Sequence, residues 1–138
     1  MKHFYYYSDN LKILKNAHKE NLANEFIVSG IFLKYKVVFD FAVKVLKELL
    51  RYEGCSVGNS GSPREIIKEA YKMYDCIEEE VWLSMLRDRN DLTHIYDGEQ
   101  AQKLVNVILE KYIPAFVVLQ EKLLESIREE GIILYEKV

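Results

Sequence analysis

Residues 30–53 read GIFLKYKVVFDFAVKVLKELLRYE, and their apolar residues recur at steps of three and four. This spacing is typical of one buried face of an α-helix. The residues expected on that face are Ile31, Tyr35, Val38, Phe39, Ala42, Val45, Leu46 and Leu49. Further apolar residues widen the face, which indicates burial on two sides: Phe32, Val37, Phe41, Val43 and Leu50. We favour a central core helix; the alternative is a partner interface, and a dimer would satisfy both.

The same helical spacing continues along the rest of the chain, which contains only two prolines and six glycines. The sequence therefore predicts an all-α fold. The other expected helices run from Ser8 to about Phe26, from Pro63 to about Tyr74, from about Ile77 to Arg89, and from Asp97 to about Glu130. Pro114 should bend the last helix without breaking it. The apolar residues 132–135 are expected to dock on the bundle or on a neighbour.

The helix that begins at Pro63 has an explicit start signal. Ser62 can cap it, Pro63 suits its first position, and Glu65 completes a capping box. The preceding residues 54–61 are rich in glycine and could cradle a phosphate at the helix start. They contain no P-loop lysine, so we favour a flexible loop instead.

Composition and charge limit the possible functions. With 138 residues, 49% of them hydrophobic, the chain predicts one domain over residues 1–138. Its net charge of −3 excludes a broadly basic nucleic-acid surface, so any such contact needs a local patch or one completed by a second subunit. No apolar stretch reaches the roughly 18 residues of a membrane span, and we expect a cytoplasmic protein that does not enter the membrane.

The cysteines and histidines suggest no metal or redox site. Cys55 and Cys76 form no CxxC pair and have no cluster of histidines beside them. A disulfide framework and a zinc site are therefore disfavoured, and no cofactor is predicted. The ten tyrosines could stack on bases, but most lie at helical spacing beside aliphatic residues, which favours core packing.

Residues 89–97, RNDLTHIYD, contain the densest chemistry of the chain. The Arg89 guanidinium suits phosphate oxygens, the His94 imidazole exchanges protons near neutral pH, and Tyr96 adds a phenol. Such a set can hold and cleave a phosphodiester, or can be modified by a nucleotide. The alternative is a capped helix end, in which Arg89 pairs with Asp88 or Asp91 and Asp97 caps the next helix.

Two features of the sequence oppose RNA binding at this stretch. Asp88, Asp91 and Asp97 surround it with negative charge, which weakens the attraction for phosphates. The acidic chain also shows no obvious track for an RNA backbone.

Two stretches together resemble the nucleotidyltransferase substrate-binding proteins of the HEPN superfamily. They are Gly61-Ser62-Pro63-Arg64-Glu65 and Trp82-Leu83-x-Met85-Leu86-x-Asp88-Arg89-Asn90-x-Leu92-Thr93-His94-x-Tyr96-Asp97. The resemblance extends over nearly the whole chain. It implies an antiparallel four- to five-helix up-and-down bundle that forms a homodimer. It also implies a partner, a minimal nucleotidyltransferase encoded nearby, in pairs that often act as toxin and antitoxin.

The resemblance also assigns roles to residues. The family pattern of arginine, a polar residue and a histidine four to six positions on falls on Arg89, Asn90 and His94. In HEPN ribonucleases these residues form one metal-independent site between two subunits. In related toxin pairs the tyrosine at the position of Tyr96 receives AMP, which would silence the ribonuclease. The alternative is a non-catalytic module that presents a substrate or a surface to the transferase.

Overall fold

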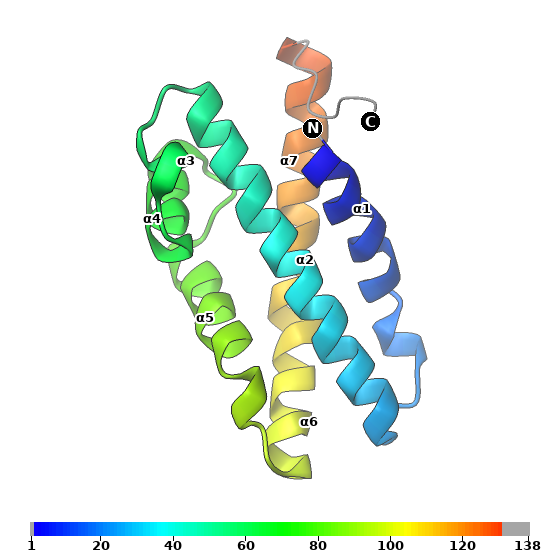
Figure 1. The fold of residues 1–138 in the computed structure, drawn as a ribbon. Coiled ribbons are helices and arrows are strands. Elements are labelled where there is room, and N and C mark those ends of the chain that lie inside the picture. The colour runs from blue at the N-terminus through cyan, green and yellow to red at the C-terminus, as the bar shows by residue number, and fades with distance from the viewer. Residues whose placement is uncertain (1, 131–138) are drawn as a thin grey trace.

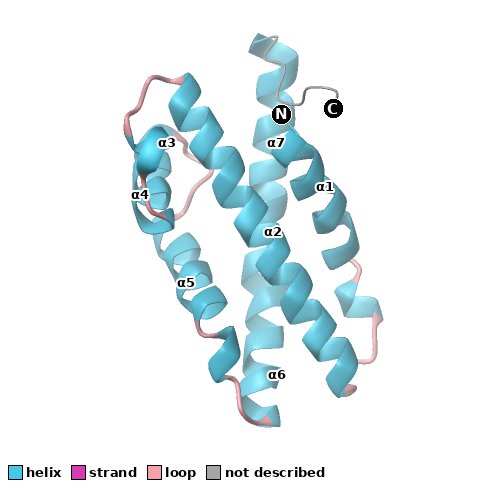
Figure 2. Ribbon diagram, viewed as in Figure 1, coloured by secondary structure: helices cyan, strands magenta, loops and turns pink. Residues whose placement is uncertain are grey.

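The computed structural model describes residues 2–130, with side chains through Ser126. This part of the chain contains helices and loops but no strand (Figure 2). The helices pack along one another as a bundle, with α2 (Glu25–Tyr52) in the middle of the view (Figure 1). The all-α prediction is therefore confirmed.

The remaining elements follow one another with short connections. They are α1 (Lys2–Leu14), a 3-10 turn (Ala17–Lys19), α3 (Val57–Ser60), α4 (Pro63–Met73), α5 (Glu79–Asn90), a second 3-10 turn (Leu92–His94), α6 (Gly98–Val107), a π-helical turn (Ile108–Tyr112) and α7 (Ile113–Glu130). None of the helices in this described part is both long and apolar enough to cross a membrane.

Helix α2 is the core helix that its spacing predicts. All eight residues expected on its main face are buried, and the flanking Leu50 is buried as well. The helix begins at Glu25, earlier than expected, because the Asn24 side chain accepts hydrogen bonds from the backbone N–H groups of Phe26 and Ile27. Gly54 follows its end with a φ of +77°, a left-handed conformation that favours glycine.

The first helix differs from the prediction of Ser8 to Phe26. Helix α1 spans Lys2–Leu14, because its buried stripe already begins at the aromatic residues Phe4 and Tyr7. The Tyr7 hydroxyl donates a hydrogen bond to the carbonyl of Phe116, 2.5 Å away in α7. The asparagine-rich residues 16–24 then turn the chain back toward α2. Phe26 lies in α2 and is exposed.

The last predicted helix is continuous through Pro114, as expected. Helices α6 and α7 join through the π-helical turn directly before this proline. Proline has no N–H, and its ring clashes with the carbonyl four residues earlier. Here that residue is Glu110, which lies within the wider π-helical turn. The buried face of the whole segment from α6 to α7 contains Leu104, Val105, Ile108, Tyr112, Phe116, Leu119 and Leu123. The predictions for the side chain of Ile127 and for residues 132–135 lie outside the described part.

Two buried tyrosines fix the end of α5. The Tyr35 ring stacks on the Tyr112 ring, with centroids 5.6 Å apart. The Tyr35 hydroxyl donates to the carbonyl of Met85 over 2.5 Å, and the Tyr112 hydroxyl donates to the carboxylate of Asp88. Burial raises the pKa of both phenols, so both stay neutral donors at physiological pH. Core packing of these tyrosines is thus confirmed, and it positions the residues just before Arg89.

Candidate functional site

The stretch that carries most of the chemistry spans three kinds of local structure. Arg89 and Asn90 form the last turn of α5, His94 ends the second 3-10 turn, and Tyr96 lies in the loop before α6. The Asp97 side chain accepts a hydrogen bond from the backbone N–H of Gln100 over 2.8 Å, which confirms that it caps α6. The four candidate residues are thus close neighbours in the sequence but belong to different local structures.

Arg89 is held by a carboxylate from another helix. Its Nε and Nη2 groups donate to the two oxygens of Asp40 in α2, each over 2.9 Å. These hydrogen bonds raise the pKa of the Arg89 guanidinium. The pairing with Asp88 or Asp91, which belongs to the alternative of a capped helix end, is not the one formed. Asp88 instead accepts from Tyr112.

Asp40 is the residue that sequence reasoning missed. It precedes Arg89 by 49 positions, and no motif marks it. Its only signal is a carboxylate in an otherwise apolar stretch of the central helix. Because α2 and α5 pack side by side, this carboxylate meets the end of α5.

His94 and Tyr96 form an exposed pair. His94 Nδ1 lies 3.2 Å from the hydroxyl oxygen of Tyr96, and the two rings meet edge to face. The Tyr96 side chain is 80% exposed. Its backbone is fixed, because the Tyr96 N–H donates to the side-chain oxygen of Gln100 over 3.0 Å. The phenol therefore lies at the surface with an imidazole nitrogen at hydrogen-bond distance.

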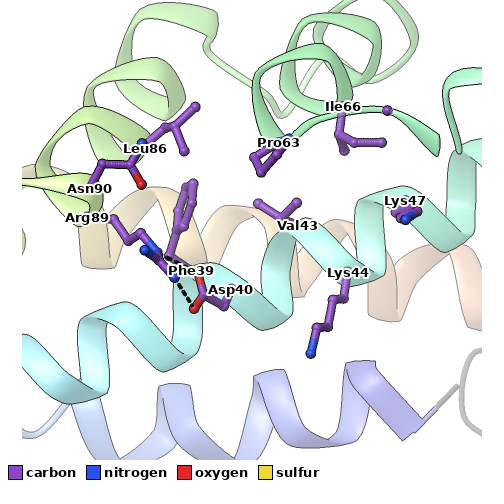
Figure 3. A pocket seen from close by; sticks show the side chains of 11 residues that line it. Phe39, Asp40, Val43, Lys44, Lys47, Pro63, Ile66, Leu86, Arg89 and Asn90 are labelled. Carbon is purple, nitrogen blue, oxygen red and sulfur yellow. Dashed lines mark hydrogen bonds and ion pairs between the residues drawn. The ribbon is translucent and has the colours of Figure 1, made fainter.

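A pocket of about 430 Å³ lies beside Arg89. It is lined by α2, the start of α4 and the end of α5 (Figure 3). Three cationic side chains line it, those of Arg89, Lys44 and Lys47. The one carboxylate in the lining is that of Asp40. Asn90 also lines it, whereas His94 and Tyr96 do not. The predicted site is thus divided into a basic pocket and an exposed imidazole and phenol pair.

The thiols and the metal-ligating side chains suggest no further chemistry. Cys55 and Cys76 are free thiols, and burial raises the pKa of Cys76, which leaves it a poor nucleophile. No group of three or more histidine, cysteine or acidic side chains is arranged to hold a metal ion in the described part of the chain.

Comparison with known proteins identifies the family. The search of curated proteins finds no match to this chain. A family model described as "Nucleotidyltransferase substrate binding protein like" matches residues 2–125, which includes every helix from α1 to α6 and both halves of the site. The chain therefore belongs to the nucleotidyltransferase substrate-binding protein-like family.

Proposed function

We propose that this chain is the HEPN subunit of a two-gene system, and that its partner, a minimal nucleotidyltransferase encoded nearby, transfers AMP to Tyr96. The family description supports a nucleotidyltransferase partner. The observation that carries the proposal is the exposed Tyr96 phenol, whose hydroxyl lies 3.2 Å from His94 Nδ1. A residue that a second protein modifies must reach that protein's active site, and this side chain can.

The pair also suggests how the hydroxyl becomes a nucleophile. The Tyr96 oxygen attacks the α-phosphorus of an ATP held by the transferase, and a new oxygen–phosphorus bond forms. The bond from that phosphorus to the bridging oxygen of the β-phosphate breaks, and pyrophosphate leaves. His94 accepts the phenolic proton, as a general base within hydrogen-bond distance.

In the unmodified state, we propose, two copies of the chain cleave RNA without a metal ion, in the manner of a toxin. The exposed His94 accepts the proton of a ribose 2′-hydroxyl, and its counterpart in the second copy protonates the leaving oxygen. Arg89 stabilises the charged phosphorane, and Asn90 lies beside it. AMP on Tyr96 would add bulk and negative charge two residues from His94, and so would block the RNA.

A second function, a non-catalytic module that presents a substrate to the transferase, is favoured by a different observation. The pocket beside Arg89 has a volume in the range of ordinary ligand sites and is lined by Lys44 and Lys47. Lys44 and Lys47 can attract an anion to that pocket, whereas Arg89 already gives two of its donors to Asp40. Binding of this kind needs no catalytic group.

The AMP proposal is tested by mass measurement. Purified chain, transferase and ATP should give an adduct of one or more AMP units, and Tyr96→Phe should abolish it. Tyr52→Phe is the matched control, because Tyr52 is also well exposed, at 63%. An unchanged mass, or an adduct that survives in Tyr96→Phe, would refute the assignment.

The ribonuclease proposal is tested separately in EDTA. The unmodified wild type should cleave RNA, whereas His94→Ala and Arg89→Ala should not. AMP-modified protein should also be inactive. If the wild type cleaves no RNA at any protein concentration, the non-catalytic module is the better description.

A further inference from the structure

Helix α2 carries a row of basic side chains that leads to Arg89. Lys36, Lys44, Lys47 and Arg51 follow one another at helical spacing, with Asp40 in the gap. At 3.6 residues per turn they lie within about 80° of one another around the helix axis. The row is about 22 Å long at 1.5 Å per residue. It gathers positive charge on one face of a chain whose net charge is −3.

The carboxylates near this row are already engaged. Asp40 binds Arg89 over 2.9 Å and lies 3.4 Å from the Nζ of Lys36. Glu48 accepts a hydrogen bond from the His3 ring. Neither acid lies at ion-pair distance from the far part of the row, which consists of Lys44, Lys47 and Arg51.

The other cations lack an acidic partner. Lys44 Nζ lies 5.1 Å from the centroid of the Phe41 ring, and Arg51 Nη2 donates to the carbonyl of Gly58 over 3.3 Å. Within the described side chains, no carboxylate lies at ion-pair distance from Lys44, Lys47 or Arg51. A solvated helix face would explain single lysines, but here the unpaired charges adjoin a pocket that also contains Arg89.

The pocket joins the row to the end of α5. Lys44 and Lys47 line it from α2, and Arg89 lines it from α5. In Figure 3 the Arg89 and Asp40 pair lies on one side of the view, and the two lysines lie on the other. The half-buried Val43 and Leu86 line the same pocket with apolar surface. The whole surface is therefore elongated, basic and partly apolar.

We infer that the basic row of α2, through its unpaired members Lys44, Lys47 and Arg51, is a binding track for a single-stranded polyanion, and that it guides an RNA strand to Arg89. A linear row suits the successive phosphates of a strand better than the compact anion of a single nucleotide. The inference deepens the proposed ribonuclease by giving the path of its substrate. Binding along the track does not require cleavage, so the two can fail separately.

The experiment measures binding of a fluorescent single-stranded RNA by anisotropy, in a His94→Ala background that prevents cleavage. Lys44→Gln with Lys47→Gln should weaken binding on the order of tenfold at low salt. It should also reduce the slope of log affinity against log salt by about 1.4, since each lost contact to a single strand contributes about 0.7.

The matched control is Lys12→Gln with Lys15→Gln. Like the tested pair, these two lysines are three positions apart, and both are exposed. Lys12 lies in the last turn of α1, Lys15 follows the end of that helix, and neither belongs to the row. They should leave the affinity and the salt slope unchanged. Equal losses in both double variants would show nonspecific attraction and overturn the track.

Free nucleotide distinguishes the other source of phosphate. ATP is added as a competitor at a phosphate concentration equal to that of the RNA. If ATP displaces the RNA, and the displacement requires Lys44 and Lys47, the site is a nucleotide pocket and the strand assignment is overturned. Absence of RNA binding in the folded His94→Ala protein would refute the track directly. RNA binding that depends on the lysines, in a protein whose wild type does not cleave, would support the track and refute only the ribonuclease.

Discussion

Arg89, in the last turn of α5, is bound by both carboxylate oxygens of Asp40, in the middle of α2, with both nitrogen-to-oxygen distances at 2.9 Å. A guanidinium has five N–H groups, and Asp40 uses two of them, on the Nε and Nη2 side. The N–H groups of Nη1 and one of Nη2 remain for a phosphate. Asp40 thus fixes the orientation of Arg89, and its negative charge offsets the positive charge of the guanidinium.

The first prediction concerns this pair. Asp40→Asn should lower the free energy of unfolding by about 1 kcal/mol, because the ion pair is bidentate but both side chains are about one-third exposed. Denaturant unfolding measures the change. Asp91→Asn is the control, since its side chain is exposed and should alter stability little. A loss as small as that of the control would mean that the pair adds nothing to stability.

The second prediction concerns the proton acceptor beside Tyr96. If His94 accepts the phenolic proton, His94→Ala should slow AMP transfer by between about 100- and 10,000-fold, the usual range for a general base. The rate of adduct formation with the transferase and ATP measures this. His18→Ala is the control, because His18 is also exposed but lies in the first 3-10 turn. An unchanged rate in His94→Ala would place the base on the transferase.

The third prediction concerns the cap that supports the loop of Tyr96. Asp97→Ala removes the acceptor for the Gln100 N–H and should cost about 1 kcal/mol of stability, as the loss of an N-cap usually does. Asp97→Asn keeps an oxygen at the same position and should cost less. Thermal unfolding of the two variants compares them. Equal stability of Asp97→Ala and the wild type would contradict the capping role.

The fourth prediction concerns the close contact between α3 and α2. A Cβ on Gly58 would lie 2.5 Å from the Arg51 backbone nitrogen and 2.9 Å from the Lys47 carbonyl oxygen. Backbone atoms cannot move aside cheaply, so Gly58→Ala should destabilise the protein by about 1 to 3 kcal/mol.

Gly30→Ala provides the opposite control for this substitution. Gly30 lies within α2, and a Cβ there would meet nothing within 4 Å. The change should therefore stabilise the helix, by roughly 0.5 to 1 kcal/mol. Similar effects of the two alanine variants in denaturant unfolding would refute the close-packing argument.

The fifth prediction concerns alkaline pH. Burial, and then the hydrogen bond to Asp88, raises the pKa of Tyr112 above its ordinary value of 10.0, so the folded state favours the neutral phenol. This contribution is fully present below about pH 10 and is lost as the pH rises further toward the raised pKa. Tyr112→Phe lacks it at every pH. The difference in unfolding free energy between wild type and Tyr112→Phe should thus be constant at neutral pH and shrink above about pH 10. Denaturant unfolding at several pH values measures this difference. A difference that grows above about pH 10 would contradict the prediction.

Local patterns were enough to predict the helices and most of the core. The spacing along α2 identified all eight residues of its main face, and Ser62 with Glu65 identified the start of α4, where both capping-box hydrogen bonds form. These features depend on residues within a few positions of one another. The start of α1 was missed because its stripe consists of Phe4 and Tyr7 in an aromatic cluster that also contains the exposed Tyr5 and Tyr6.

The candidate site divides in the same way. The run from Arg89 to Tyr96 is visible in the chain because its members are neighbours, and the same holds for the cap at Asp97. The pairing of Arg89 with Asp40, the pocket around them and the continuity of the basic row with α5 depend on how α2 and α5 pack. Periodicity shows which face of a helix is buried. However, the helices could pack against one another in many ways that all bury the same apolar faces. Packing of the whole core selects one of them, and with it the distant carboxylate that Arg89 meets.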